Sequence, residues 1–356
     1  MTGGYLLLIS ALTLTFLGGA AVEGKAAACT SAQGQALIDE GRYEQAAQKF
    51  TCVINSDPTA VDGYRGRVEA ELLLGKFSDA VLDYQRIMAY VLPVHPDAKQ
   101  TILDDYATRL NADPYSVTAL TGAMGARWWF FEYSTAIHLA DELLDIDANN
   151  LAGNTFRGSS RMLSGSNRVR GAEDLERAIS LDPSNPHVRF IAADAYTYGQ
   201  PDPQRAFDEA MFALNAGLNT PRIHAILAVS YHAFVDELTA AAEIKTHIDL
   251  VTTQLVTTAP LASGATSSLQ LVPGRSYDIP LSLTAGQSVS IATSSPDFWD
   301  TIAVLIAPDG TPVVGSDDAK KYFAAFTYTP LISGVYHLRV TSFESVNTGT
   351  LIVKRD

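Results

Sequence analysis

Two cysteines are the side chains of this sequence that can react covalently with one another. Cys29 and Cys52 are the only cysteines among 356 residues. Such a pair in an exported chain indicates a disulfide, because an oxidising compartment favours the bond. The alternative is lipid attachment at Cys29, but Ala26 stands where a lipoprotein signal usually has Leu, and Cys52 would be left unpaired. We therefore predict a disulfide between Cys29 and Cys52.

Three aspartates in predicted C-terminal turns are the candidates for metal binding. Asp300, Asp317 and Asp318 stand between short β-rich runs. Oxygen-rich loops suit Ca²⁺, whereas Asp also serves simply to make turns. Both interpretations stay open, a Ca²⁺ site at these residues or ordinary turns, and we expect no other cofactor.

The histidines do not form a catalytic motif. All seven are scattered along the chain, which contains neither HExxH nor GxSxG. His224 and His232 are eight residues apart, so they share a helix face only loosely. We therefore predict a binding protein rather than an enzyme.

The charge balance argues against one class of partner. The chain has 39 acidic and 25 basic residues, a formal charge of -14 and a pI of about 4.9. A surface of this sign repels phosphate backbones. Nucleic acid is therefore not an expected partner.

An apolar N-terminal run predicts export. Residues 5–17, "YLLLISALTLTFL", are too few to span a bilayer, and the small residues of "GGAAVEGKAAAC" follow. This order is typical of a signal peptide, here over 1–28. "MTGGY" has no Lys or Arg, so an uncleaved N-terminal anchor is the alternative. We expect a protein that is secreted, periplasmic or held at the cell surface, and not membrane-spanning after processing.

A repeated phrase indicates how the first part is built. "GRYEQAAQKF" at 41–50 returns as "GKFSDAVLDY" at 75–84, a step of 34 residues. Ala46, Phe50 and Val53 fall at i, i+4 and i+7, so they form one apolar stripe of a helix that follows a turn at Gly41. One helical hairpin cannot bury its apolar face alone, so neighbouring hairpins must stack into a solenoid.

These residues resemble the tetratricopeptide repeat (TPR) family. Its pattern of a turn Gly, an aromatic, a small residue, a second aromatic and a closing Pro is matched in order by Gly41, Tyr43, Ala46, Phe50 and Pro58. The second unit also matches, but its closing Pro is displaced into "LPVHP". We assign 29–250 to this domain. The resemblance implies a protein or peptide ligand in a concave groove.

Outward residues of the first helices are predicted to line that groove. Helical spacing directs five side chains there: Arg65, Glu69, Thr155, Ser159 and Met162. "RWWFF" at 127–131 adds Trp128 and Trp129, which have two interpretations. They belong either to the core of the third hairpin or to an aromatic binding platform.

From about residue 252 the pattern changes to a period of two. Tyr336, Leu338 and Val340 alternate with polar residues, as a half-buried antiparallel strand requires. Several short runs of this kind are separated by turn residues. We predict a linker over 251–265 and an antiparallel β-sandwich over 266–356.

The order of these C-terminal pieces resembles the bacterial pre-peptidase C-terminal (PPC) domain. An "LTAGQSVSI" strand is followed by an Asp-bearing turn, a "PDG" hairpin, a "DD" loop and a "GVYHLRV" strand. The resemblance implies a bacterial origin, secretion and attachment to a surface or matrix. That family usually follows a protease, whereas this chain has helical repeats.

Together these patterns predict an α-solenoid of TPR-like helical hairpins followed by an antiparallel β-sandwich. We expect a non-catalytic scaffold or adaptor that binds a protein or peptide in the solenoid groove. The alternative is an accessory module that binds an extracellular polysaccharide or matrix protein through the β-sandwich.

Overall fold

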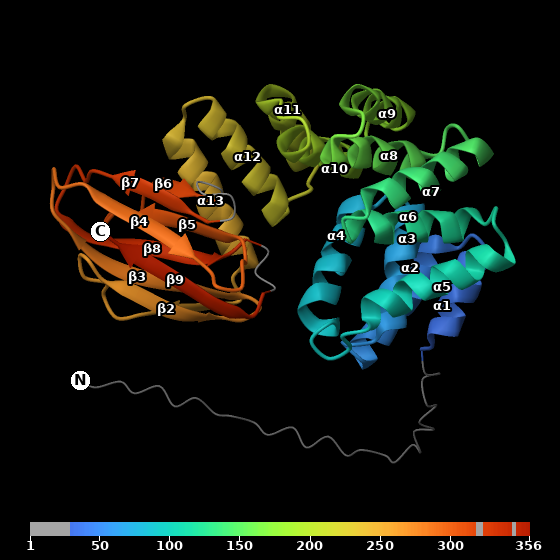
Figure 1. The fold of residues 1–356 in the computed structure, drawn as a ribbon, viewed down its shortest axis with the longest axis horizontal. Helices are drawn as coiled ribbons and strands as arrows, with labels where there is room; N and C mark the ends of the chain where they lie inside the picture. The colour runs from blue at the N-terminus through green and yellow to red at the C-terminus, as the bar shows by residue number, and fades with distance from the viewer. Residues whose placement is uncertain (1–28, 318–322, 344–346) are drawn as a thin grey trace, which may run out of the picture.

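The structure, a computed structural model of the chain, describes residues 29–317, 323–343 and 347–356. The predicted signal peptide, 1–28, and Asp318 lie outside the described residues. Helices occupy the first part of the described chain and strands the second part, as predicted (Figure 1). None of the described helices has the length and apolar character needed to cross a membrane.

Six helical hairpins form the solenoid within the described residues. They pair α1 with α2, α3 with α4, α6 with α7, α8 with α9, α10 with α11, and α12 with α13. Neighbouring hairpins stack, since α2 packs on α3, α7 on α8 and α11 on α12. The bounds are Ser31–Asp39, Tyr43–Ser56, Val61–Leu73, Phe77–Arg86, Val117–Trp129, Tyr133–Ile146, Leu151–Ser164, Arg168–Leu181, Pro186–Tyr198, Pro203–Asn215, Pro221–Ala233 and Glu237–Val251.

Glycines make the turns and the close approaches of the first two hairpins. Gly41 and Gly75 have φ angles of +74° and +70°, a left-handed conformation that glycine adopts without steric cost. Phe50 of the predicted apolar stripe is fully buried. A Cβ atom on Gly66 would lie 2.1 Å from the Phe50 ring, and one on Gly34 would lie 2.6 Å from it. The packing of α1, α2 and α3 around this ring therefore requires both glycines.

After the second unit, where the closing Pro is displaced into "LPVHP", the chain contains an inserted helix. α4 continues into a π-helix, η1 (Ile87–Val91), and α5 (Ala98–Ala112) precedes the third hairpin. Arg109 on α5 donates hydrogen bonds of 2.6 and 2.7 Å to the carboxylate of Glu69 on α3. Because α6 also packs directly on α3, the stack continues from the second hairpin to the third.

The solenoid curves until its second hairpin meets its fifth. The hydroxyl of Ser78 on α4 lies 2.7 Å from Nδ1 of His187 on α10. The side-chain amide of Asn185 donates to the carbonyl oxygen of Gly75 at 3.4 Å. These residues are about a hundred positions apart in the chain, so the contact depends on the curvature of the whole stack. It places α4 opposite the first helices of the later hairpins.

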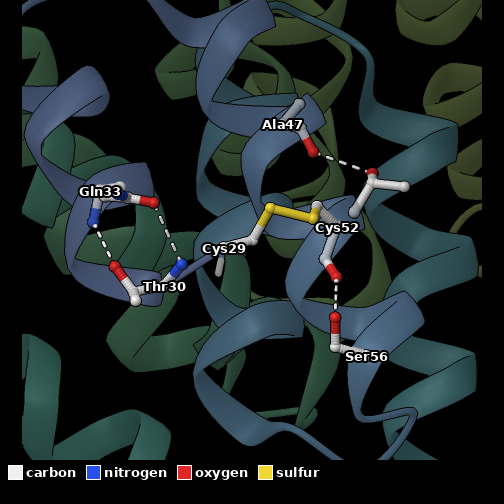
Figure 2. The surroundings of a disulfide bond; sticks show 7 residues. Cys29, Thr30, Gln33, Ala47, Cys52 and Ser56 are labelled. Atoms are coloured by element: carbon white, nitrogen blue, oxygen red, sulfur yellow. Dashed lines mark hydrogen bonds between the residues drawn. A yellow bond between two sulfur atoms is a disulfide. The ribbon is translucent and has the colours of Figure 1, made fainter. Parts of the chain in front are cut away.

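The predicted disulfide is present in the first hairpin. Cys29, just before α1, is bonded to Cys52 near the end of α2, with 5.9 Å between their Cα atoms (Figure 2). Beside it, Thr30 and Gln33 form a reciprocal cap of α1 in which each backbone N–H meets the other side chain. The start of α1 is thus held both covalently and by hydrogen bonds.

Two sheets form the C-terminal β-sandwich. One has the order β1-β3-β8-β5-β6 and the other β2-β9-β4-β7. The pairs are antiparallel except for β1, which runs parallel to β3. Tyr336, Leu338 and Val340 are buried, as their alternation predicted. The strand bounds are Gln254–Thr257, Thr266–Leu271, Arg275–Leu283, Val289–Ser294, Thr301–Ile306, Pro312–Ser316, Ala325–Tyr328, Gly334–Ser342 and Gly349–Arg355.

The last helix joins the solenoid to the sandwich through a shared core. α13 packs on β5 and β6, and Ile244 and Ile248 are buried with Ile302 and Val304 (Figure 1). Residues 251–265, predicted as a linker, contain the end of α13 and strand β1. Leu261 in this segment is buried against the sandwich core. The segment is therefore packed in the structure.

Candidate binding cleft

A cavity of about 350 Å³ lies where the solenoid meets the sandwich. We call it the junction cleft. The solenoid supplies six aromatic side chains to its wall: Trp128, Trp129, Phe131, Tyr133, Phe190 and Tyr198. Phe343, which follows β8 of the sandwich, supplies a seventh. These aromatic residues come from the third and fifth hairpins and the sandwich. Val81 and Gln85 of α4, Leu163 of α8 and Arg222 of α12 add the second, fourth and sixth hairpins to the wall.

The two tryptophans are held in place by contacts behind the wall. Trp129 stacks on Tyr84 with 5.5 Å between ring centroids and 9° between ring planes. Trp128 meets the ring of Phe156 edge to face, and its Nε1–H donates to the hydroxyl of Ser159 at 3.0 Å. These contacts within the fold fix the orientation of both indoles.

The structure supports the core interpretation of "RWWFF", whereas a binding platform stays a prediction. Trp128 is 8% exposed and belongs to the solenoid core, as does the partly buried Trp129. The same two side chains also line the junction cleft. One aromatic cluster therefore supports the third hairpin and forms part of a concave surface.

Phe131 differs from the other aromatic residues of the wall. It is 76% exposed, and its φ angle is +61°. Its ring makes an edge-to-face contact with Tyr133, at 6.2 Å between centroids. Phe131 therefore stands at the rim of the cleft rather than in its floor.

The polar groups of the cleft are few and interact with one another. Nε of Arg222 on α12 donates to the carboxylate of Asp194 on α10 at 2.7 Å. The guanidinium of Arg222 also lies over the rings of Tyr198 and Phe343, 4.4 and 5.2 Å from their centroids. Burial, and to a smaller extent Asp194, raises the pKa of Tyr133 to about 12, so its hydroxyl stays protonated. Asp300 adds a second carboxylate.

Arg65 and Glu69, predicted for the groove, lie instead in a buried ion-pair cluster. Glu69 is fully buried and Arg65 is 7% exposed. Arg109 and Asp105 of α5 complete the cluster. Burial raises the pKa of Glu69, although the neighbouring guanidinium groups of Arg109 and Arg65 oppose this effect. The inserted α5 covers this face of α3, which the repeat pattern alone would have left open.

Thr155, Ser159 and Met162 are also buried rather than presented to a ligand. All three are fully buried. The Thr155 hydroxyl donates to the carbonyl oxygen of Leu151 within α8, and Ser159 accepts the bond from Trp128. The reason is that α8 packs against α6, α9 and α10, so little of its surface faces the groove.

The described residues contain no complete set of ligands for the predicted Ca²⁺ site. Residues 29–317, 323–343 and 347–356 contain no group of three or more His, Cys, Asp or Glu side chains suited to a metal ion. Asp300 lines the junction cleft, and Asp317 is buried near β6. Asp318, the third candidate, lies outside the described residues.

Several cleft residues were not singled out from the sequence. They are Phe131, Tyr133, Phe190, Asp194, Tyr198, Arg222 and Phe343. Phe131 and Tyr133 carried local signals, because Phe131 ends "RWWFF" and Tyr133 occupies the repeat position of Tyr43. The others meet only through the curvature of the solenoid and its contact with the sandwich.

Comparison with known proteins returned structural matches only. No family model matches the chain, and no curated protein matches it. Most matched structures are TPR proteins. One from Parabacteroides merdae is 15% identical, with coverage of 63% of this chain and 92% of that one and a TM-score of 0.40. One from Thermus thermophilus is 16% identical, with coverage of 56% and 96% and a TM-score of 0.35.

The C-terminal strands match a different structure. It is the pre-peptidase C-terminal domain of a collagenase from Bacillus anthracis, which is 12% identical. The match covers 29% of this chain and 95% of that domain, with a TM-score of 0.25.

Proposed function

We propose that this chain is an exported, non-catalytic scaffold that holds a peptide segment of a partner protein in the junction cleft. The observation that carries the proposal is the cleft itself, a cavity of about 350 Å³ with seven aromatic side chains in its wall. Ligand sites are typically concave and mostly apolar, with a few polar groups that fix orientation. Aromatic side chains also contribute much of the binding energy at protein interfaces.

The charge of the chain supports a protein partner rather than a nucleic acid. A formal charge of -14 opposes phosphate backbones and favours basic surfaces. The disulfide between Cys29 and Cys52 is consistent with export, because such bonds persist in oxidising compartments. Attachment to a cell surface or matrix through the sandwich, and binding of a polymer there, are the alternative uses.

Filling the cleft tests the proposal. Leu163 lines the cleft from the end of α8, and its replacement in the variant Leu163→Trp adds bulk to that wall. The control is Val169→Trp on α9, since Val169 is 70% exposed and does not line the cleft. Proteins from the native envelope or culture fluid are captured on the immobilised full chain, and the captured protein is then purified and titrated.

A loss of about tenfold or more in affinity for Leu163→Trp alone supports the cleft as the binding site, which corresponds to at least about 1.4 kcal/mol. Equal binding by the wild type and both variants would exclude it. In that case, binding of a polysaccharide or matrix protein to the chain, unaffected by Leu163→Trp, would support the alternative function of the sandwich.

A further inference from the structure

Phe131, in the turn before α7, has a backbone conformation that is unfavourable for residues other than glycine. Four hairpin turns place a residue in the left-handed region two positions before the second helix. Gly41 and Gly75 fill this position in the first two hairpins, with φ of +74° and +70°. Phe131 and Val235 fill it in the third and last hairpins, with φ of +61° and +64°. For residues with a Cβ atom, this conformation is strained.

Packing within the chain does not explain the phenylalanine. Phe131 is 76% exposed, and its edge-to-face contact with Tyr133 is the ring contact found for it in the described chain. A glycine would relieve the backbone strain and remove an apolar ring from water. Strained residues are concentrated at functional sites, and lining of the junction cleft distinguishes Phe131 from the similarly strained Val235. Phe131 also lines the junction cleft, which gives the ring a place to act.

We propose that Phe131 contacts the ligand directly, and that the ligand is a peptide segment with one large apolar side chain flanked by Lys or Arg. The inference rests on the proposed function and deepens it. The ring of Phe131 at the rim would close over the apolar side chain once that side chain enters the cleft.

The size and lining of the cleft favour one large apolar anchor. Ligand pockets span roughly 300–1,000 Å³, and the cavity of about 350 Å³ is near the lower limit. It therefore suits a single anchoring side chain with its neighbouring backbone. Trp128 and Trp129 are already fixed by Ser159 and Tyr84, so the anchor meets an ordered aromatic surface.

The charge of the cleft wall and of the whole chain indicates which residues should flank the apolar side chain of the peptide. The wall carries two carboxylates, Asp194 and Asp300, and one guanidinium, Arg222, which is hydrogen-bonded to Asp194, so these side chains together have one net negative charge. The whole chain adds a formal charge of -14. Basic side chains beside the anchor are therefore attracted to the rim, and acidic ones are repelled. Exposed aromatic rings such as Phe131 also favour nearby cations.

A peptide library displayed on phage tests the ligand chemistry. Random dodecapeptides are selected on the full chain with its disulfide intact, and enriched peptides are synthesised with a fluorescent label. We expect an aromatic or large aliphatic residue next to Lys or Arg in the enriched set. Affinities of these peptides are then measured by fluorescence anisotropy for the wild type and for turn variants.

The turn variants separate binding from folding. Phe131→Gly places at this turn the residue that the first two hairpins use, and Phe131→Asn serves as a second variant because Asn tolerates the left-handed conformation. Val235→Gly is the matched control, since it makes the same backbone change at a turn that does not line the cleft. We expect about a tenfold or greater loss of peptide affinity for both Phe131 variants and none for Val235→Gly. The thermal midpoints should not fall for either glycine variant.

The outcomes distinguish the inference from the proposed function. Peptides that bind the wild type but bind Phe131→Gly and Phe131→Asn equally well would overturn the role of Phe131 and leave the scaffold function standing. Enriched peptides with acidic flanks would overturn the proposed ligand chemistry. Failure to enrich any peptide on the wild type, together with equal capture of proteins by Leu163→Trp, would overturn both proposals.

Discussion

Nε2 of His247 on α13 lies 2.8 Å from the carbonyl oxygen of Phe343, which follows strand β8 of the sandwich. Nδ1 of the same ring lies 2.9 Å from the carbonyl oxygen of Pro221, at the start of α12. The imidazole also packs on the Phe343 ring, with 4.7 Å between centroids. Because Phe343 is part of the junction cleft, His247 connects the cleft to the joint between the two halves.

The stability of this joint should fall in mild acid. Burial lowers the pKa of His247 from 6.5 to about 4, so the folded protein keeps the ring neutral. The unfolded chain takes up the proton first as pH falls through 6.5. The contribution of the neutral ring is therefore complete above pH 6.5 and is lost towards pH 4, where the loss reaches about 3 kcal/mol.

Urea unfolding measured from pH 7.5 to 4 checks this expectation. His247→Gln should make the free energy of unfolding less dependent on pH between 6.5 and 4. His138→Gln is the control, because His138 is exposed to solvent on α7. An equal slope in the wild type and in His247→Gln would show that His247 does not titrate in this way.

Glu71 should produce the opposite dependence on pH. Burial, and secondly the nearby Asp83, raises its pKa from 4.5 to about 9. Its Oε2 is buried and has no hydrogen-bond partner among the described residues. The stability that the protonated form provides is complete below pH 4.5 and is lost as pH rises through 9. Glu71→Gln should therefore raise the free energy of unfolding at pH 8 by about 1 kcal/mol or more.

Denaturant unfolding at pH 5 and pH 8 measures this effect. The exposed Glu44 on α2 provides the control variant, Glu44→Gln. The gain in the free energy of unfolding of Glu71→Gln over the wild type should be larger at pH 8 than at pH 5. An equal gain at both pH values would show that the carboxyl group is ionised in the folded chain.

The disulfide should stabilise the first hairpin selectively. Cys29 and Cys52 are 23 residues apart, which corresponds to about 3 kcal/mol of loop-closure entropy removed from the unfolded chain. A terminal hairpin has a neighbour on one side only, so it is where fraying begins. The double variant Cys29→Ala, Cys52→Ala should speed hydrogen exchange in α1 and α2 and leave the exchange of the sandwich strands unchanged. Faster exchange spread evenly over the chain would contradict this expectation.

The solenoid and the sandwich should lose stability together when their shared core is damaged. Ile244 is fully buried against the sandwich, and a Cβ on Gly315 of β6 would lie 2.9 Å from its Cδ1. Ile244→Ala should cost about 2–5 kcal/mol. Circular dichroism in the helical and strand bands should show both transitions moving, whereas Leu250→Ala, at a half-exposed site on the same helix, should leave them unchanged.

Limited proteolysis of the same variants shows which segment becomes accessible when the shared core is damaged. The packed segment 251–265 should resist cleavage in the wild type and become a cleavage site in Ile244→Ala. Rapid cleavage there in the wild type, with both fragments remaining folded, would instead show that the solenoid and the sandwich are independent folding units.

Local pattern was sufficient to predict most of the architecture. The 34-residue step between Gly41 and Gly75 predicted helical hairpins with a turn at this glycine, and both glycines lie in such turns. The alternation at Tyr336, Leu338 and Val340 predicted a strand with one buried face. In both cases the signal is a short-range backbone or side-chain periodicity, which depends on residues close together in the chain.

The junction cleft could not be predicted in the same way. Helical spacing identified Thr155, Ser159 and Met162 as residues off the apolar stripe, but spacing does not say which neighbouring helix will cover them. Glu69 was likewise predicted for the groove and is covered by α5. The position of that inserted helix depends on packing that no repeat pattern records.

By itself the sequence determined that helical hairpins precede a β-sandwich, that two cysteines can pair, and that "RWWFF" concentrates aromatic residues in the third hairpin. Only the tertiary structure decided where a ligand could bind. The junction cleft brings together Val81 and Phe343, which are far apart in the chain, because the solenoid curves and α13 docks on the sandwich. Local periodicity specifies the apolar face of each element, whereas the surface left open is specified by the neighbours that cover the rest.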